Sequence, residues 1–289
     1  MTLAFANSKM PPVRALLVLC IVLGHFSYYG VPALAPVRSL AVPAVAMFLF
    51  ISGYGLTRSW QLKGAAYLRG FFSGRILRIA LPAALVALLH RLLTGSFGNL
   101  PHYWFVWTIL YDYLLFWACR KFLPEKAAAC AILAGVVLFA CGTALTGFDR
   151  CWWIGALAFP AGAAFAEHED AVFGFCGRKE ANYWLTLLAL IAASAALFLT
   201  GSLACRTLCY VFLPLAGALL VARIPVDGLR LQVLAWLGSI SYELYLVHIS
   251  VMLLLQGSFS APAFIALTLA VSIAAAFAIR LLCQLITHK

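Results

Sequence analysis

The chain has 289 residues, of which 65% are hydrophobic and 10% are charged, and its formal net charge is +11. Soluble domains carry about 25% charged residues, so this composition excludes a soluble globular protein. The apolar residues form long runs without the alternation, in segments of about ten residues, that marks a membrane β-barrel. The sequence therefore predicts an all-α fold, a polytopic transmembrane helical bundle, with residues 1–289 in one integral membrane domain.

About ten membrane spans follow one another along the chain, each near the length that a helix needs to cross a bilayer. We predict them at residues 13–30, 40–57, 76–93, 102–118, 128–146, 152–166, 183–200, 203–222, 233–255 and 261–285. The first span keeps Lys9 and Arg14 at its start and has no small-residue cleavage site. It is therefore expected to be a retained helix and not a removed signal peptide.

The distribution of cations predicts the orientation of these spans. If the amino terminus is cytoplasmic, the 20 lysines and arginines gather on the cytoplasmic side with few exceptions. The exceptions are Arg38, Arg91, Arg150 and Arg206. Such a bias is typical of multi-pass membrane proteins, so we expect a cell-membrane protein with a cytoplasmic amino terminus. The positive net charge then reflects topology, and nucleic-acid binding has no separate support.

Two ionisable residues, Arg14 and His25, lie within the first predicted span. Eleven helical steps come to three turns plus about 20°, so both side chains share one stripe, about 16 Å apart along the axis. Ionisable groups inside a membrane are costly and usually serve function. The alternative is a snorkelling arginine at the helix end and a buried, hydrogen-bonded histidine. His25 is our first candidate for a general base, and Arg14 is expected either to hold phosphate groups of a ligand or to maintain the electrostatics of the site.

A second signal is the basic segment between the second and third spans, interpreted as a cytoplasmic loop. Its cations are Arg58, Lys63, Arg69, Arg75 and Arg78. Glycines between them allow the backbone to approach a ligand, and arginines can clamp phosphate groups in bidentate fashion. An ordinary positive-inside loop resting on anionic lipid headgroups is the alternative.

The ninth span holds Glu243 and His248. Five residues place them about 140° apart, so they are predicted to lie on different faces, whereas Ser241 and His248 nearly share one. Both Glu243 and His248 are candidate catalytic residues. The alternative for each is a structural polar contact between helices.

The fourth span carries aromatic and polar residues at helical spacing. They are Trp104, Trp107, Thr108 and Tyr111, with Asp112 in the middle of the span. Aromatic faces stack on sugar rings, although Trp and Tyr also gather at membrane interfaces. We predict a substrate-binding role for Trp104, Trp107, Tyr111 and Asp112. Ser52 is interpreted as a close-packing or pore-lining residue that borders the same substrate site.

The remaining polar residues are interpreted as structural. Glu167, Glu169 and Asp170 are predicted to form a solvated loop. The nine cysteines are scattered without a CxxC pair or a histidine at metal-ligand spacing, so no metal is expected. A disulfide between Cys151 and Cys205, both predicted near the outer surface, is not expected.

Several of these segments resemble the membrane acyltransferase-3 family. The stretch from Arg14 to His25 matches the family's Arg-x10-His signature, and Phe48–Tyr54 is similar to its aromatic-rich segment Ser-Gly-Tyr or Ser-Gly-Phe. Three further matches follow in the family's order. They are Arg75–Arg78 with Pro82 after it, His102–Phe105, and Ser241–His248.

The resemblance implies an integral membrane O-acyltransferase. Its donor would be cytosolic acyl-coenzyme A, with acetyl-CoA favoured as the co-substrate, and its acceptor would be a hydroxyl of a cell-surface glycan or related molecule. The basic segment would seat the nucleotide phosphates, and His25 would activate the acceptor or carry the acyl group itself. A transporter or channel that uses the buried Arg, His and Glu as a relay is the alternative, and a catalytically silent family member is a third.

Overall fold

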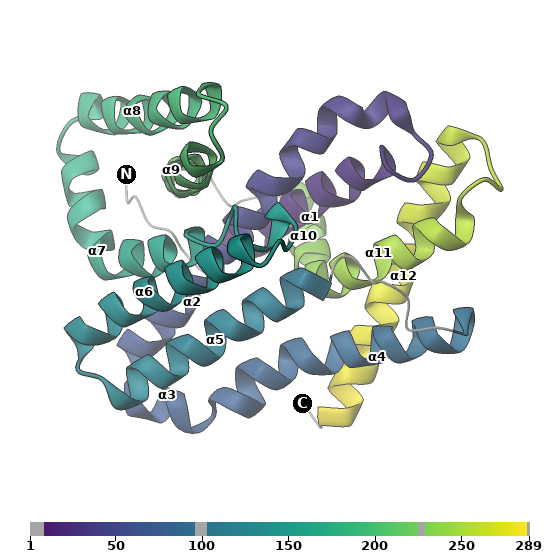
Figure 1. The fold of residues 1–289 in the computed structure, drawn as a ribbon, viewed down its shortest axis with the longest axis horizontal. Coiled ribbons are helices and arrows are strands. Elements are labelled where there is room, and N and C mark those ends of the chain that lie inside the picture. The colour runs from purple at the N-terminus through teal and green to yellow at the C-terminus, as the bar shows by residue number, and fades with distance from the viewer. Residues whose placement is uncertain (1–8, 96–102, 225–228, 288–289) are drawn as a thin grey trace. The chain divides into compact units, whose positions relative to one another are not determined.

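The structure is a computed structural model that describes residues 9–95, 103–224 and 229–287, with backbone alone for 229–231. Every regular element in these residues is helical, which confirms the predicted all-α membrane bundle (Figure 1). The α-helices are α1 Met10–Phe26, α2 Ala41–Lys63, α3 Ala65–Arg69, α4 Leu77–Thr94, α5 Tyr103–Phe122, α6 Glu125–Leu145, α7 Ala158–Arg178, α8 Glu180–Leu199, α9 Leu203–Arg223, α10 Leu229–Ser239, α11 Ser241–Leu255 and α12 Ala261–Thr287. Short 3-10 helices, η2 Pro32–Leu40 and η4 Arg150–Trp152, and a π-helical turn, η3 Phe72–Ile76, connect them.

Six helices in the described residues are long and apolar enough to cross a membrane, or seven if the bent pair α10–α11 is one span. The predicted count of about ten is therefore not confirmed. α1 is an apolar helix but has only 17 residues. The expected span at 233–255 is not straight, because the chain bends by 69° between Ser239 and Ser241.

The helices form two compact units that interleave along the chain. The first unit comprises residues 1–9, 45–71 and 107–226, and the second comprises residues 10–44, 72–106 and 227–289. Each unit has its own set of helix contacts.

In the first unit, α7 packs against α6, α8 and α9, and α8 packs along α9 (Figure 1). α2 joins this group through two glycines that let the backbones approach closely. A Cβ atom on Gly53 would collide with the carbonyl oxygen of Phe159, and one on Gly162 would collide with that of Phe50. Small residues at such crossings are typical of packed membrane helices. Gly53 belongs to the Ser-Gly-Tyr segment, so close packing explains the glycine of that motif.

In the second unit, α1 packs along α10 and α11, and α12 contacts both α11 and α4, which it crosses in Figure 1. Gly238 lies directly against the carbonyl group of Pro11, so that no side chain fits between α10 and the start of α1. The Tyr242 hydroxyl donates to the Ile79 carbonyl oxygen at 2.9 Å and ties α11 to α4. These contacts fix α1 and α11, which carry His25 and His248, against each other.

Two predictions of local structure are wrong. The basic segment 58–78 is helical rather than a loop: α2 continues to Lys63, and α3 and η3 follow after Gly64, which adopts a positive φ of 52°. The acidic residues Glu167, Glu169 and Asp170 are not in a solvated loop either, because α7 begins only at Ala158 and runs through them to Arg178. The predicted span at 152–166 therefore begins before the first residue of α7 and ends before its last residue.

Candidate active site

The two histidines of the predicted site meet in the second unit. His25 Nδ1 lies 2.8 Å from the Ile21 carbonyl oxygen, and His248 Nδ1 lies 2.6 Å from that of Tyr245. Because a carbonyl oxygen only accepts hydrogen bonds, these contacts place a proton on Nδ1 of each neutral ring. His248 Nε2 then carries a lone pair, and it faces Nδ1 of His25 at 3.3 Å.

This arrangement leaves Nε2 of His25 as the basic atom of the pair. The Nδ1–H group of His25 is shared between Ile21 and His248, whereas no hydrogen bond to Nε2 is found among the described residues. If Nε2 takes up a proton, the resulting imidazolium still has two acceptors at Nδ1. A histidine oriented in this way by a second group has the geometry of a general base.

Arg14 occupies α1 with His25 but lies about 16 Å away along the helix axis. Its side chain is half-buried. At this separation Arg14 cannot touch the histidine pair. The arginine and the histidine of the Arg-x10-His signature therefore lie at different positions along α1 in the second unit.

Glu243 is held by a different partner from His248. Its Oε1 atom lies 3.5 Å from Nη1 of Arg280 on α12, while Oε2 is buried and has no hydrogen-bond partner in the described part of the chain. The predicted separation of Glu243 and His248 onto different faces agrees with these contacts. Sequence reasoning did not select Arg280, because a lone arginine near the end of the last span is typical of the positive-inside pattern.

Glu243 and Arg280 border a cleft of about 290 Å³ that also receives Arg78 from α4. Its walls come from α4, α11 and α12: Leu77, Arg78, Leu81, Pro82, Glu243, Arg280, Cys283, Gln284 and Thr287. Two arginines and one glutamate are the charged residues of this lining, and the excess of positive charge favours an anionic ligand. Five residues of α11, about 7.5 Å of helix rise, separate Glu243 from His248.

The five cations of the basic segment are divided between the two units. Arg58, Lys63 and Arg69 belong to the first unit, and Arg75 and Arg78 belong to the second. Lys63, Arg69 and Arg78 are exposed, whereas Arg58 and Arg75 are half-buried. Of the five, Arg78 lines the cleft.

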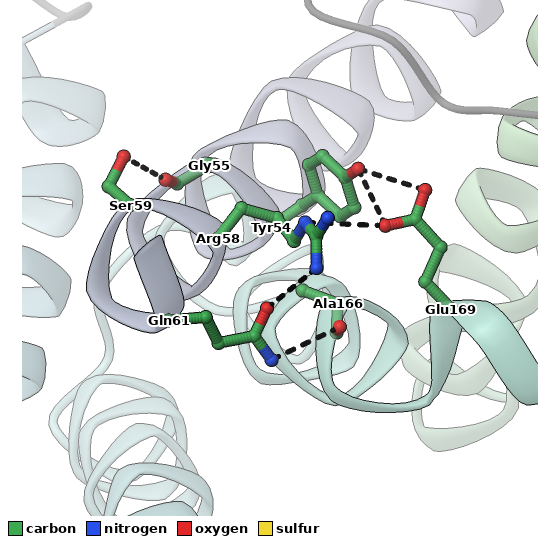
Figure 2. A network of polar contacts seen from close by, with 7 residues as sticks. All are labelled: Tyr54, Gly55, Arg58, Ser59, Gln61, Ala166 and Glu169. Atoms are coloured by element: carbon green, nitrogen blue, oxygen red, sulfur yellow. Dashed lines mark hydrogen bonds and ion pairs between the residues drawn. The ribbon is translucent and has the colours of Figure 1, made fainter. Parts of the chain in front are cut away.

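Arg58 belongs to a polar network between α2 and α7 (Figure 2). Its Nε lies 3.5 Å from Oε2 of Glu169, and its Nη1 donates to Gln61 at 2.9 Å. The Tyr54 hydroxyl donates to the same carboxylate, at 3.0 Å to Oε1 and 2.9 Å to Oε2. Tyr54 is the tyrosine of the Phe48–Tyr54 segment, so the aromatic residue that ends this segment is held by a carboxylate from α7.

Sequence reasoning missed Glu169 and also Glu167, which pairs with the buried Arg120 of α5. A signal was present, because the buried residues of α7 continue at helical spacing through the acidic residues. They include Phe165, Ala166, Glu169, Phe173 and Cys176. This period indicates a helix that runs past position 166, with Glu169 on its buried face.

The aromatic row on α5 divides into residues with different surroundings. The Tyr111 hydroxyl donates to the Gly135 carbonyl oxygen at 2.8 Å, and its ring stacks on Phe139 of α6. Trp107 is 62% exposed, and Trp104, in the second unit, is half-buried. Tyr111 is thus engaged in helix packing within the first unit. His102, which begins this motif, lies outside the described residues.

Asp112 and Ser52, the other predicted substrate residues, are also in the first unit. Asp112 is 1% exposed, and neither of its carboxylate oxygens has a hydrogen-bond partner within the described ranges. Ser52 is half-buried on α2 beside the close helix contact at Gly53.

The cysteines are all free thiols. Burial and the neighbouring charge of Asp149 raise the pKa of Cys151, which lies in the connection before α7, to about 11, so its thiol is a poor nucleophile at neutral pH. Across the described ranges, no group of three His, Cys, Asp or Glu side chains could hold a metal ion.

The acyltransferase-3 family model, described as an acyltransferase domain, matches residues 13–288 and so includes both units. No curated protein and no solved structure matches the chain.

Proposed function

Because the chain belongs to the acyltransferase-3 family of membrane acyltransferases, we propose that it transfers an acyl group, with acetyl favoured, from acyl-CoA in the cytosol. The acceptor is a hydroxyl group of a cell-surface glycan or a related molecule. The observation that carries the proposal is the Nε2 atom of His25, which has no hydrogen-bond partner among the described residues, while the Nδ1–H group of the same ring is held by Ile21 and His248.

His25 acts as the general base in this proposal. Nε2 accepts the proton of the acceptor hydroxyl while the hydroxyl oxygen attacks the carbonyl carbon of the thioester. The tetrahedral intermediate then expels the coenzyme A thiolate, which takes the proton from His25. His248 is a positioning residue, because its Nε2 accepts from His25 and supports the imidazolium that forms in the middle of the reaction.

The cleft at Arg78, Glu243 and Arg280 is the proposed seat for the phosphates of the donor. Guanidinium groups bind phosphates in bidentate geometry, and a phosphate could replace Glu243 as the partner of Arg280, whose contact with that carboxylate is long. The donor arm would then extend along α11 toward His248. Arg75, in η3 just before Arg78, and Arg14 are further candidates for holding the donor; the same role for Arg58, Lys63 and Arg69 stays a prediction.

The test uses purified full-length protein, labelled acetyl-CoA and a membrane extract as the source of acceptor. We expect His25→Ala to lower the rate of label transfer by about 10²-fold or more, the usual contribution of a general base, while coenzyme A still binds. His248→Ala should lower kcat less, because His25 is then present but poorly oriented. His168→Ala is the control, since His168 is an exposed histidine on α7.

Near-normal turnover in the His25→Ala variant contradicts the base role. A protein that moves a solute across the membrane but neither binds coenzyme A nor transfers label contradicts the acyltransferase proposal itself.

A further inference from the structure

The turn that follows α1 presents an aromatic ring directly beside His25. The Tyr28 backbone N–H donates to the His25 carbonyl oxygen at 2.9 Å, and the centroids of the two rings lie 6.3 Å apart. Tyr28 is nevertheless 60% exposed. An exposed ring at this place can hold a molecule whose reacting atom lies next to His25.

Arg38 of η2 lies over the same ring. Its guanidinium carbon is 5.0 Å from the centroid of Tyr28, and its side chain is exposed. A Cβ atom on Gly24 would lie 3.3 Å from the Arg38 Cα, so the glycine brings η2 close against the end of α1. No ion pair of Arg38 with a carboxylate occurs among the described residues, which leaves its charge available to a ligand.

We propose that Tyr28 and Arg38 form the acceptor-binding platform of this enzyme and that they select an acceptor whose sugar carries a negative charge. This inference rests on the proposed function. The sugar ring stacks on Tyr28, its carboxylate or phosphate pairs with Arg38, and a hydroxyl of the same sugar reaches Nε2 of His25.

The position of the platform fits an acceptor that arrives from the side opposite to the donor. Tyr28 and Arg38 lie beyond the carboxyl end of α1, whereas Arg14 lies near its amino end. Aromatic faces bind the apolar faces of sugars, and an arginine fixed over a ring is well placed to pair with an anion.

The experiment measures acetyl transfer from acetyl-CoA to three acceptors: methyl β-glucoside, methyl β-glucuronide and glucose 1-phosphate. We expect the wild type to have a lower KM for the two charged sugars. Arg38→Gln should raise KM for both charged sugars by about tenfold, as for one lost charge-assisted hydrogen bond, with kcat and the neutral sugar unaffected. Tyr28→Ala should raise KM for all three, and Tyr28→Phe should restore it. The two charged sugars distinguish a carboxylate from a phosphate acceptor.

Arg91→Gln is the matched control, because Arg91 is another exposed arginine that the charge pattern places on the outer side. Saturation-transfer NMR measures binding of the three sugars in the absence of acetyl-CoA, and this readout is independent of turnover. Charge-selective binding that Arg38→Gln removes supports the platform even if no acetyl group is transferred, in which case the proposed function alone fails. Equal KM and equal binding of charged and neutral sugars, or the same change in Arg91→Gln, overturns the platform.

Discussion

At the scale of single residues, the second unit places charged and polar groups at separate levels. Glu243, which pairs with Arg280 of α12, lies about 7.5 Å along α11 from His248, and His248 contacts His25. Tyr28 follows His25 at the end of α1. The proposed function gives each level its own role: anion binding at the cleft, proton transfer at the histidines and acceptor contact at the exposed aromatic ring.

The cleft yields a prediction for donor binding. Replacing Arg78 or Arg280 with glutamine should weaken coenzyme A binding by about tenfold and should flatten its dependence on salt, because a charge-assisted contact in a partly exposed cleft is lost. Calorimetric titration of purified protein at two ionic strengths measures both effects. Lys179→Gln is the control, since Lys179 is an exposed cation at the end of α7 outside the cleft. Unchanged affinity in both arginine variants would show that these cations serve membrane orientation alone.

At the scale of helices, glycine decides which surfaces come together. Gly53 on α2 meets the Phe159 backbone, and Gly238 on α10 meets that of Pro11. Van der Waals packing of this kind is a main source of helix association in a membrane. The hydrophobic effect does not drive helices together there, because the lipid tails are as apolar as the side chains. The α2 contact also brings Tyr54 to the Glu169 carboxylate, so one close approach creates a buried polar network.

The α2–α7 contact can be tested with two neighbouring glycines. Gly53→Ala should destabilise the protein by about 1–3 kcal/mol, because the added methyl group collides with the Phe159 backbone. Gly55→Ala, on the same helix, has no neighbour within 4 Å and should be neutral or slightly stabilising. Thermal denaturation in detergent distinguishes the two variants. Equal melting temperatures would contradict the close contact.

At the scale of the whole molecule, the proposed reaction requires access from both sides of the membrane. The donor is proposed to be cytosolic and the acceptor external. The positive-inside pattern predicts that the basic segment 58–78 is cytoplasmic and that the connection before α12 is external.

Cysteine labelling tests this topology. In a variant without the nine native cysteines, Ser73→Cys and Ser258→Cys each introduce one thiol at an exposed position. A membrane-impermeant thiol reagent added to intact cells should label Ser258→Cys and should reach Ser73→Cys only after the membrane is opened. Labelling of both from outside would mean that cytosolic acyl-CoA cannot meet Arg75 and Arg78, and the transmembrane transfer would fail.

The sequence by itself determined the fold class, because composition and long apolar runs leave only a helical bundle in lipid. It also determined the family, since motifs such as Arg14 to His25 are local patterns. Helical geometry correctly separated Glu243 from His248, because both residues lie on α11, where the angle between them follows from their spacing.

Only the tertiary structure decided which groups meet. His25 and His248 are 223 residues apart in the chain, and Glu243 and Arg280 are 37 apart, so no local period relates either pair. The prediction of a loop for the acidic residues of α7 is wrong because it rests on the expectation that charged side chains face solvent. Tyr54 and Arg58 of α2 supply the partners that allow Glu169 to be buried. A buried charge depends on its partner for stability, and that partner is fixed by packing rather than by neighbouring sequence.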